Sequence, residues 1–159
     1  MSTDQTIELT TLSELVSNEQ YARKVLPFIK SEYFADRTER ILFEEIQKFV
    51  EKYNALPTQS TLEIEIDTRR DLNENDISRI LSTVKSLKSD KEINYDWLVE
   101  TTEKWCKDRA VYNAIVEGIS IIDGKDKARS ADSIPSILTD ALAVGFDNHV
   151  GHDYLEDSE

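Results

Sequence analysis

Two histidines near the end of the chain are the residues best suited to metal chemistry. The sequence closes with FDNHVGHDYLEDSE, in which His149 and His152 are three residues apart and Asp153 follows directly. Imidazole and carboxylate groups can bind zinc, but a structural zinc site uses four ligands, mostly cysteine and histidine. The chain has two histidines and one cysteine. We therefore predict an exposed linker and no metal ligand, with a small metal-dependent hydrolase built on these three residues as an alternative.

The sequence offers few residues that could form a nucleophilic catalytic site. A Ser–His–Asp or Cys–His site would have to use the two histidines, which lie in the least regular part of the sequence, or Cys106, which falls inside an expected helix. Catalytic groups need rigid support from packed elements. We predict no catalytic residue in this chain.

A nucleotide site is also not expected. Phosphate-binding loops need clustered glycines, so that backbone N–H groups can approach the anion closely. The four glycines, Gly118, Gly124, Gly145 and Gly151, are scattered, and no G-x-x-x-x-G-K-[ST] motif occurs. We predict no cofactor-binding residue.

Trp97 and Trp105 are the residues that could stack on nucleic-acid bases. Single-strand binders interleave such aromatics with lysine and arginine, whereas the basic residues near these two are offset by acidic ones. The net charge of −13 also disfavours contact with a phosphate backbone. We expect no strong direct nucleic-acid binding, and we interpret Trp105 as part of a core or a helix–helix interface. A basic partner would suit the charge.

The elements that position these residues are expected to be helices. The chain has 159 residues with only 4 glycines and 3 prolines, too few for the turns of an all-β domain. Apolar spacing predicts short helices between residues 7 and 90, then a helix–loop–helix from 95 to 147. In STLEIEI, Leu62, Ile64 and Ile66 alternate as in a strand, but Ser60 and Glu63 resemble a capping box, and we predict a helix. The expected fold is all-α: a small helical bundle over residues 1–92, an extended helical hairpin over 95–147, and a polar tail over 148–159.

The expected compartment is the cytoplasm. Cys106 is the only cysteine, so no intrachain disulfide can form, which is typical of a reducing compartment. The start, MSTDQTIELT, has no basic region followed by an apolar stretch. No apolar run approaches the ~18 residues of a transmembrane helix, so we expect no membrane contact.

The expected hairpin carries more apolar surface than its own two helices can cover. Leu98, Trp105, Tyr112 and Ile119 are each seven residues apart, with Ile115 and Ile122 beside them. The second helix adds an apolar face that includes Ile137, Leu138 and Leu142. This surface must pack either on the first half of the chain or on another chain.

The stretch SEYFADRTERILFEEIQKFVEKYNALPTQSTLEI resembles the amino-terminal domain of DnaB-family replicative helicases. The order of a phenylalanine, an apolar helix, a proline-containing turn and a Thr-Leu helix start is carried by Phe34, Leu42, Phe43, Ile46, Pro57, Thr61 and Leu62. DWLVETTEKWCKDRAVYNAI and the terminal FDNHVGHDYLEDSE are similar to the branch of this family found in T4-like bacteriophages.

The resemblance implies an architectural role. Such domains pair through their hairpins to build a collar on a helicase ring, and phage primase docks on the collar. It also implies that 148–159 begins a linker to a RecA-like motor domain, which would bind ATP and magnesium and is absent from this sequence. The expected subunit interface consists of Leu98, Trp105, Tyr112, Ile115, Ile119, Ile137, Leu138 and Leu142. The alternative is a stand-alone acidic phage protein that mimics DNA and inhibits a host DNA-binding protein.

Overall fold

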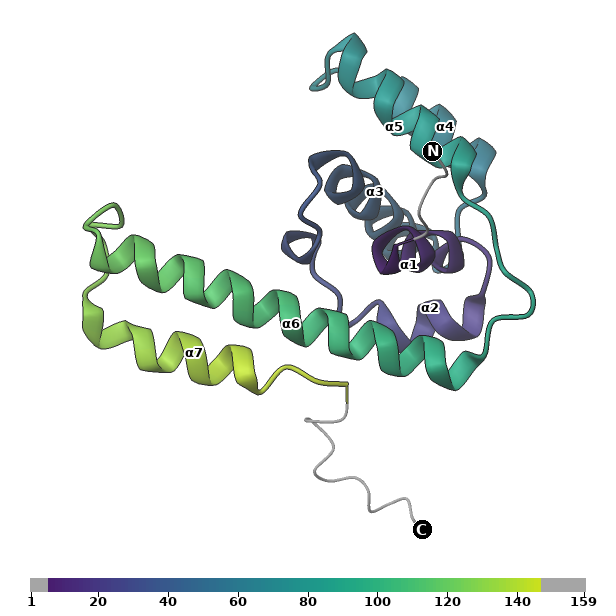
Figure 1. The fold of residues 1–159 in the computed structure, drawn as a ribbon. Coiled ribbons are helices and arrows are strands. Elements are labelled where there is room, and N and C mark those ends of the chain that lie inside the picture. The colour runs from purple at the N-terminus through teal and green to yellow at the C-terminus, as the bar shows by residue number, and fades with distance from the viewer. Residues whose placement is uncertain (1–5, 147–159) are drawn as a thin grey trace. The chain divides into compact units, whose positions relative to one another are not determined.

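The computed structural model describes residues 6–146, and every regular element in that range is a helix (Figure 1). This confirms the all-α fold predicted from the sequence. The expected tail over residues 148–159 lies outside the described residues. In chain order the elements are α1 (Ile7–Leu15), α2 (Glu19–Val25), η1 (Ser31–Tyr33), α3 (Arg37–Tyr53), α4 (Gln59–Asp67), α5 (Glu74–Ser86), α6 (Tyr95–Ile122), η2 (Ala131–Ser133) and α7 (Ile134–Leu142).

The chain divides into two compact units, residues 1–99 and 100–159. The division falls inside α6, whereas the sequence places the change from bundle to hairpin at residues 92–95, before that helix begins. The sequence-based boundary stays a prediction. None of the helices between residues 6 and 146 is long and apolar enough to cross a membrane.

Helices of the first unit begin at short polar side chains that accept a hydrogen bond from the first turn. Such a cap satisfies a backbone N–H that has no partner inside the helix and contributes about 1 kcal/mol. Asn18 caps α2 and Asp36 caps α3 in this way. The full set of side-chain caps for α1 to α5 is Thr6, Asn18, Asp36, Thr58 and Asn73.

The ambiguous segment forms α4, as predicted, but its cap differs from the expected one. Thr58 Oγ1 accepts a hydrogen bond from the Thr61 N–H at 3.1 Å, so the helix begins before Ser60. Leu62 and Ile66 are fully buried, while Ile64 is 64% exposed. A strand would place all three on one face. The helix instead turns Ile64 outward and keeps the other two in the core.

Helix α3 is the centre of the first unit and contacts α1, α4, α5 and η1. Its side chains Leu42 and Phe43 are fully buried. Phe34, just before the helix, packs on Phe43 with ring centroids 5.2 Å apart. The helix ends at Asn54, whose φ of 53° is left-handed, a conformation that asparagine tolerates better than most residues.

Buried polar groups fix the segment that follows α5. Ser13 Oγ accepts from the Lys88 N–H at 3.2 Å, and Glu14 Oε2 accepts from the Asp90 N–H at 2.9 Å. The Gln59 amide donates to the carbonyls that end α5, at 2.7 and 2.9 Å. Ser13 and Glu14 are buried, and because each has a partner, their burial avoids the cost of an unsatisfied polar atom.

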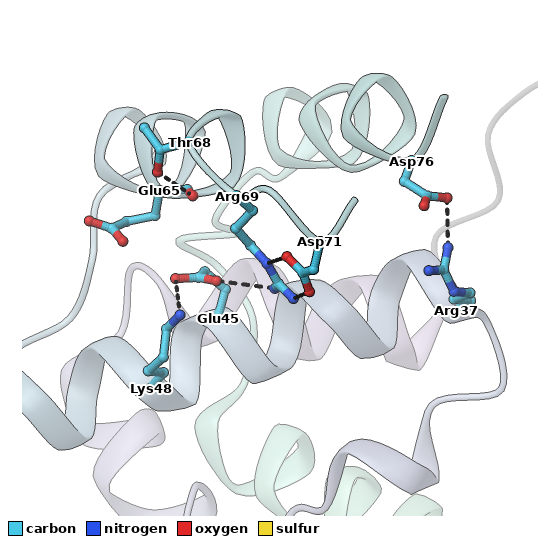
Figure 2. Close-up of polar contacts among 8 residues, drawn as sticks. All are labelled: Arg37, Glu45, Lys48, Glu65, Thr68, Arg69, Asp71 and Asp76. Carbon is cyan, nitrogen blue, oxygen red and sulfur yellow. Dashed lines mark hydrogen bonds and ion pairs between the residues drawn. The ribbon is translucent and has the colours of Figure 1, made fainter. Parts of the chain in front are cut away.

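A buried carboxylate on α3 holds the α4–α5 turn in place (Figure 2). The Glu45 side chain is 1% exposed and lies 3.3 Å from both Arg69 Nη1 and Lys48 Nζ. Arg69 also pairs with Asp71 at 2.5 Å, and this hydrogen bond lowers the pKa of Asp71 to about 2. Arg69 comes from the turn after α4, so one guanidinium joins that turn to α3.

The second unit is built from most of α6 and from α7, which runs back beside it (Figure 1). The chain reverses at Gly124, which has a φ of 78°. A methyl group added at Gly118 would lie 3.6 Å from the Ile134 side chain, so the two helices approach closely there. Beyond α7, the Phe146 N–H donates to Glu103 Oε2 at 2.8 Å. Ser133, at the N-cap position of α7, makes no side-chain capping bond, and α7 ends at Leu142, before the predicted end of the hairpin at residue 147.

Candidate protein-interaction surface

An apolar stripe runs along the second half of α6 and is open to solvent. Its members follow one another at spacings of three, one, three and three residues, which places them on one face of the helix. Their exposed fractions lie between 48% and 70%. Contiguous exposed apolar residues of this kind mark interaction sites. We call this set the α6 stripe: Tyr112, Ile115, Val116, Ile119 and Ile122.

The other side of the same helix is buried. Ala114, Gly118 and Ile121 follow spacings of four and three residues and are buried. Gly118 allows Ile134 of α7 to approach. Helix α6 is therefore apolar on two faces, and α7 approaches only the buried one. This arrangement explains why a helix with so many apolar residues still has an uncovered stripe.

Charged residues border the α6 stripe. The Arg109 guanidinium lies over the Tyr112 ring, 4.7 Å from its centroid. At the other end, Arg129 bonds Glu117 and also pairs with Asp126 at 2.6 Å. This ties the loop before η2 to α6. An apolar centre with a polar rim is the usual anatomy of a protein–protein interface.

The residues expected at a subunit interface differ in how far they are exposed to solvent. Tyr112, Ile115 and Ile119 belong to the α6 stripe. On α7, Leu142 is 60% exposed, and the other two expected residues, Ile137 and Leu138, are half-buried.

Leu98 and Trp105 are buried inside the chain, at 0% and 7% exposure. They therefore do not share a surface with Tyr112 and Ile119. The change from buried to exposed falls between Trp105 and Tyr112. These two residues lie only ~20° apart around a straight α-helix, so their exposure depends on where along its length α6 is covered.

Two members of the α6 stripe were not among the expected interface residues. Val116 lies four residues after Tyr112, and Ile122 lies three after Ile119. Both would have been found by following spacings of three and four residues instead of seven. Spacings of three and four residues therefore indicate the α6 stripe, whereas a spacing of seven residues selects a different set of side chains.

The described residues give no support for metal or thiol chemistry. No group of three His, Cys, Asp or Glu side chains between residues 6 and 146 is arranged to hold a metal ion. His149, His152 and Asp153 lie outside the described residues. Burial raises the pKa of the Cys106 thiol to about 12, with a further contribution from the charge of Glu103. A thiol with this pKa stays protonated at neutral pH and is a poor nucleophile.

Two comparisons with known proteins indicate the same family. The family model for the DnaB-like helicase N terminal domain matches residues 1–96. Among curated proteins, the chain is similar to a DnaB-like replicative helicase of Enterobacteria phage T4, with 30% identity over 156 residues. The alignment covers 93% of this chain and 32% of that helicase. The aligned share is larger than the first unit alone, so the similarity extends into the second.

Proposed function

The chain belongs to the family of DnaB-like helicase N-terminal domains, and from this premise we propose that it assembles the ring of a phage replicative helicase. Its role would be self-association through the helical hairpin, forming a collar on the ring. The observation that carries this proposal is the α6 stripe, a row of large apolar side chains that no element of the second unit covers.

A second copy of the chain is the partner that suits this surface best. In a two-fold interface the same patch is used on both partners, so two stripes can bury each other. Burial of apolar area contributes roughly 25 cal/mol per Å² before the entropic cost of association. Leu142 of α7 is also exposed and stays an expected contact, whereas buried Leu98 and Trp105 would take no part.

The proposal is tested by placing a charge in the α6 stripe. Ile119→Asp should reduce the molecular mass measured by sedimentation equilibrium, because the carboxylate would have to be buried unpaired in the interface. Ile64→Asp is the matched control: it makes the same change at another exposed helical isoleucine, in the first unit. Circular dichroism checks that both variants stay helical. Equal masses for wild type and Ile119→Asp would contradict the proposal.

We also propose that phage primase docks on this domain. The net charge of −13 supports a basic partner surface. Adding the cognate primase should then raise the mass measured by light scattering, and the complex should weaken as salt increases. If the mass measured at low salt does not change when primase is added, docking on this domain alone is contradicted.

We propose that ATP and magnesium bind outside the matched N-terminal domain, as the resemblance to replicative helicases implies. This sequence has no G-x-x-x-x-G-K-[ST] motif, and we derive no chemical step from its residues. The family match and the similarity to a replicative helicase give no support to the alternative of a DNA mimic.

A further inference from the structure

One row of residues on α6 begins and ends with opposite charges. Arg109, Tyr112, Val116, Ile119 and Asp123 follow one another at spacings of three and four residues, so they lie along one side of the helix. The three inner members belong to the α6 stripe and are exposed. Arg109 and Asp123 each lie seven residues from Val116. The row is therefore apolar in the middle, with a cation at one end and an anion equally far away at the other.

The carboxylate of Asp123 is open to a partner molecule. Asp123 directly follows the last residue of α6, and its N–H still donates to the Ile119 carbonyl at 2.9 Å, as in a helix. Its side chain is exposed and pairs with no group in the part of the chain that the structure describes. A negative charge at this position lies near the negative end of the helix dipole, which is unfavourable in a single chain. A cation from another molecule would compensate it.

Two other carboxylates beside the α6 stripe already have partners in their own chain. Asp108 pairs with Lys104 at 2.8 Å, and Glu117 bonds Arg129. Asp123 therefore differs from both of these neighbours.

Arg109 is placed at the other end of the row by an aromatic ring. Its guanidinium lies over the ring of Tyr112. A guanidinium has several N–H donors, so a ring contact leaves donors that can bind a carboxylate. Arg109 and Asp123 do not meet within one chain, because the helix between them is about 21 Å long.

These two ends meet when two copies of α6 pack side by side in opposite directions. A two-fold axis at Val116 places each residue level with the one equally far from Val116 on the other side. Arg109 of each copy is then level with Asp123 of the other copy, and Tyr112 is within one residue of Ile119. In a parallel pair each residue is level with its own counterpart, so Arg109 and Asp123 stay about 21 Å apart along the helices.

We propose that two copies of the chain pair through antiparallel α6 helices centred on Val116, with Arg109 of each copy bound to Asp123 of the other. This inference rests on the self-association proposed above and specifies its direction and register. The α6 stripe supplies the apolar area that is buried. The two ion pairs select this arrangement among others that bury similar area.

Charge reversal tests the two ion pairs. Arg109→Asp should raise the dissociation constant of the dimer at least about tenfold in sedimentation equilibrium, because two attractive contacts become repulsive. Combining it with Asp123→Arg should restore the constant to within about threefold of the wild type. Lys107→Asp is the matched control, because it makes the same change of charge at an exposed residue on the other side of the helix. It should change the constant by less than about threefold.

Cysteine cross-linking tests the direction of the helices independently of charge. In the antiparallel pair the two copies of Tyr112 are offset by about 12 Å along the helices, which is farther than a disulfide spans. Tyr112→Cys alone should therefore not cross-link on mild oxidation. An equimolar mixture of Tyr112→Cys and Ile119→Cys should give a cross-linked dimer on a non-reducing gel. The native Cys106 is buried and does not interfere.

Two results would overturn the antiparallel pairing while self-association stands. One is cross-linking of Tyr112→Cys by itself with no further cross-linking in the mixture, as a parallel pair predicts. The other is a double charge reversal that associates no better than Arg109→Asp. Circular dichroism checks that the variants fold, and cross-linking still decides if a charge variant does not. A wild type with the mass of one chain, and no cross-linking in the mixture, would overturn self-association as well.

Discussion

At the scale of single residues, the least predictable feature is the pairing of buried charges. Glu45 was one of many carboxylates on an expected helix, and nothing in its neighbourhood in the sequence indicates a partner 24 residues away. The pairing with Arg69 exists because the α4–α5 turn packs on α3. A sequence pattern that covers one helix at a time cannot reveal it.

Removal of this partner should destabilise the first unit. Arg69→Met leaves Glu45 buried with only Lys48, whose side chain is largely exposed. Breaking a buried ion pair costs several kcal/mol, and with Lys48 retained we expect about 2 kcal/mol by urea denaturation. Arg70→Met, a neighbouring exposed arginine, should change stability by less than about 0.5 kcal/mol. Equal effects of the two variants would refute a specific role for the Arg69–Glu45 pair.

A second residue-scale effect depends on pH. Burial, with repulsion from Asp36 and Glu8, raises the pKa of Glu39 from 4.5 to about 7. The folded chain therefore holds this proton more tightly than the unfolded chain, and Glu39 lowers stability as pH rises from about 4.5 to about 7.

Glu39→Gln removes that penalty. Because Glu39 is partly exposed, we expect a gain discounted to about 1 kcal/mol at pH 8 and almost none at pH 4. Thermal unfolding at both pH values measures the difference. Glu44→Gln, on the exposed side of α3, serves as the control and should show no such pH-dependent gain. A gain at pH 4 as large as that at pH 8 would rule out the titration of Glu39 as the cause.

At the scale of elements, the sequence predicted which segments are helical better than where they begin. The alternation of Leu62, Ile64 and Ile66 is typical of a strand, but the capping residues before it indicate the helix that the structure shows. The helix is capped by Thr58 and not by the predicted Ser60. The earlier start places Gln59 where its amide reaches the carbonyls at the end of α5, and this contact is tertiary.

The two candidate caps can be separated directly. Thr58→Ala should destabilise the chain by about 1 kcal/mol, because it removes the acceptor for the Thr61 N–H. Ser60→Ala should be nearly neutral, because Ser60 lies inside the first turn of α4 and is exposed. Chemical denaturation of both variants gives the comparison. A larger loss of stability in Ser60→Ala than in Thr58→Ala would show that Ser60 is the cap, as predicted from the sequence.

At the scale of the whole molecule, the pattern of apolar residues predicted that the hairpin has an exposed apolar surface, but not which residues form it. Tyr112, Ile115 and Ile119 were expected and are exposed, whereas Leu98 and Trp105 are buried. Trp105 and Tyr112 lie only ~20° apart around the helix, so the difference arises from where along its length α6 is covered, which spacing within one helix cannot show. The family resemblance supplied what periodicity could not, namely the kind of assembly in which such a surface is used.

Self-association through the α6 stripe is the central claim, and the mass of the chain in solution tests it most directly. Static light scattering over a concentration series should give a mass that rises above the 18.3 kDa of one chain toward a dimer or larger assembly. The Ile119→Asp variant should stay near the mass of one chain over the same range. A wild-type mass of one chain at every concentration, equal to that of the variant, would contradict the account.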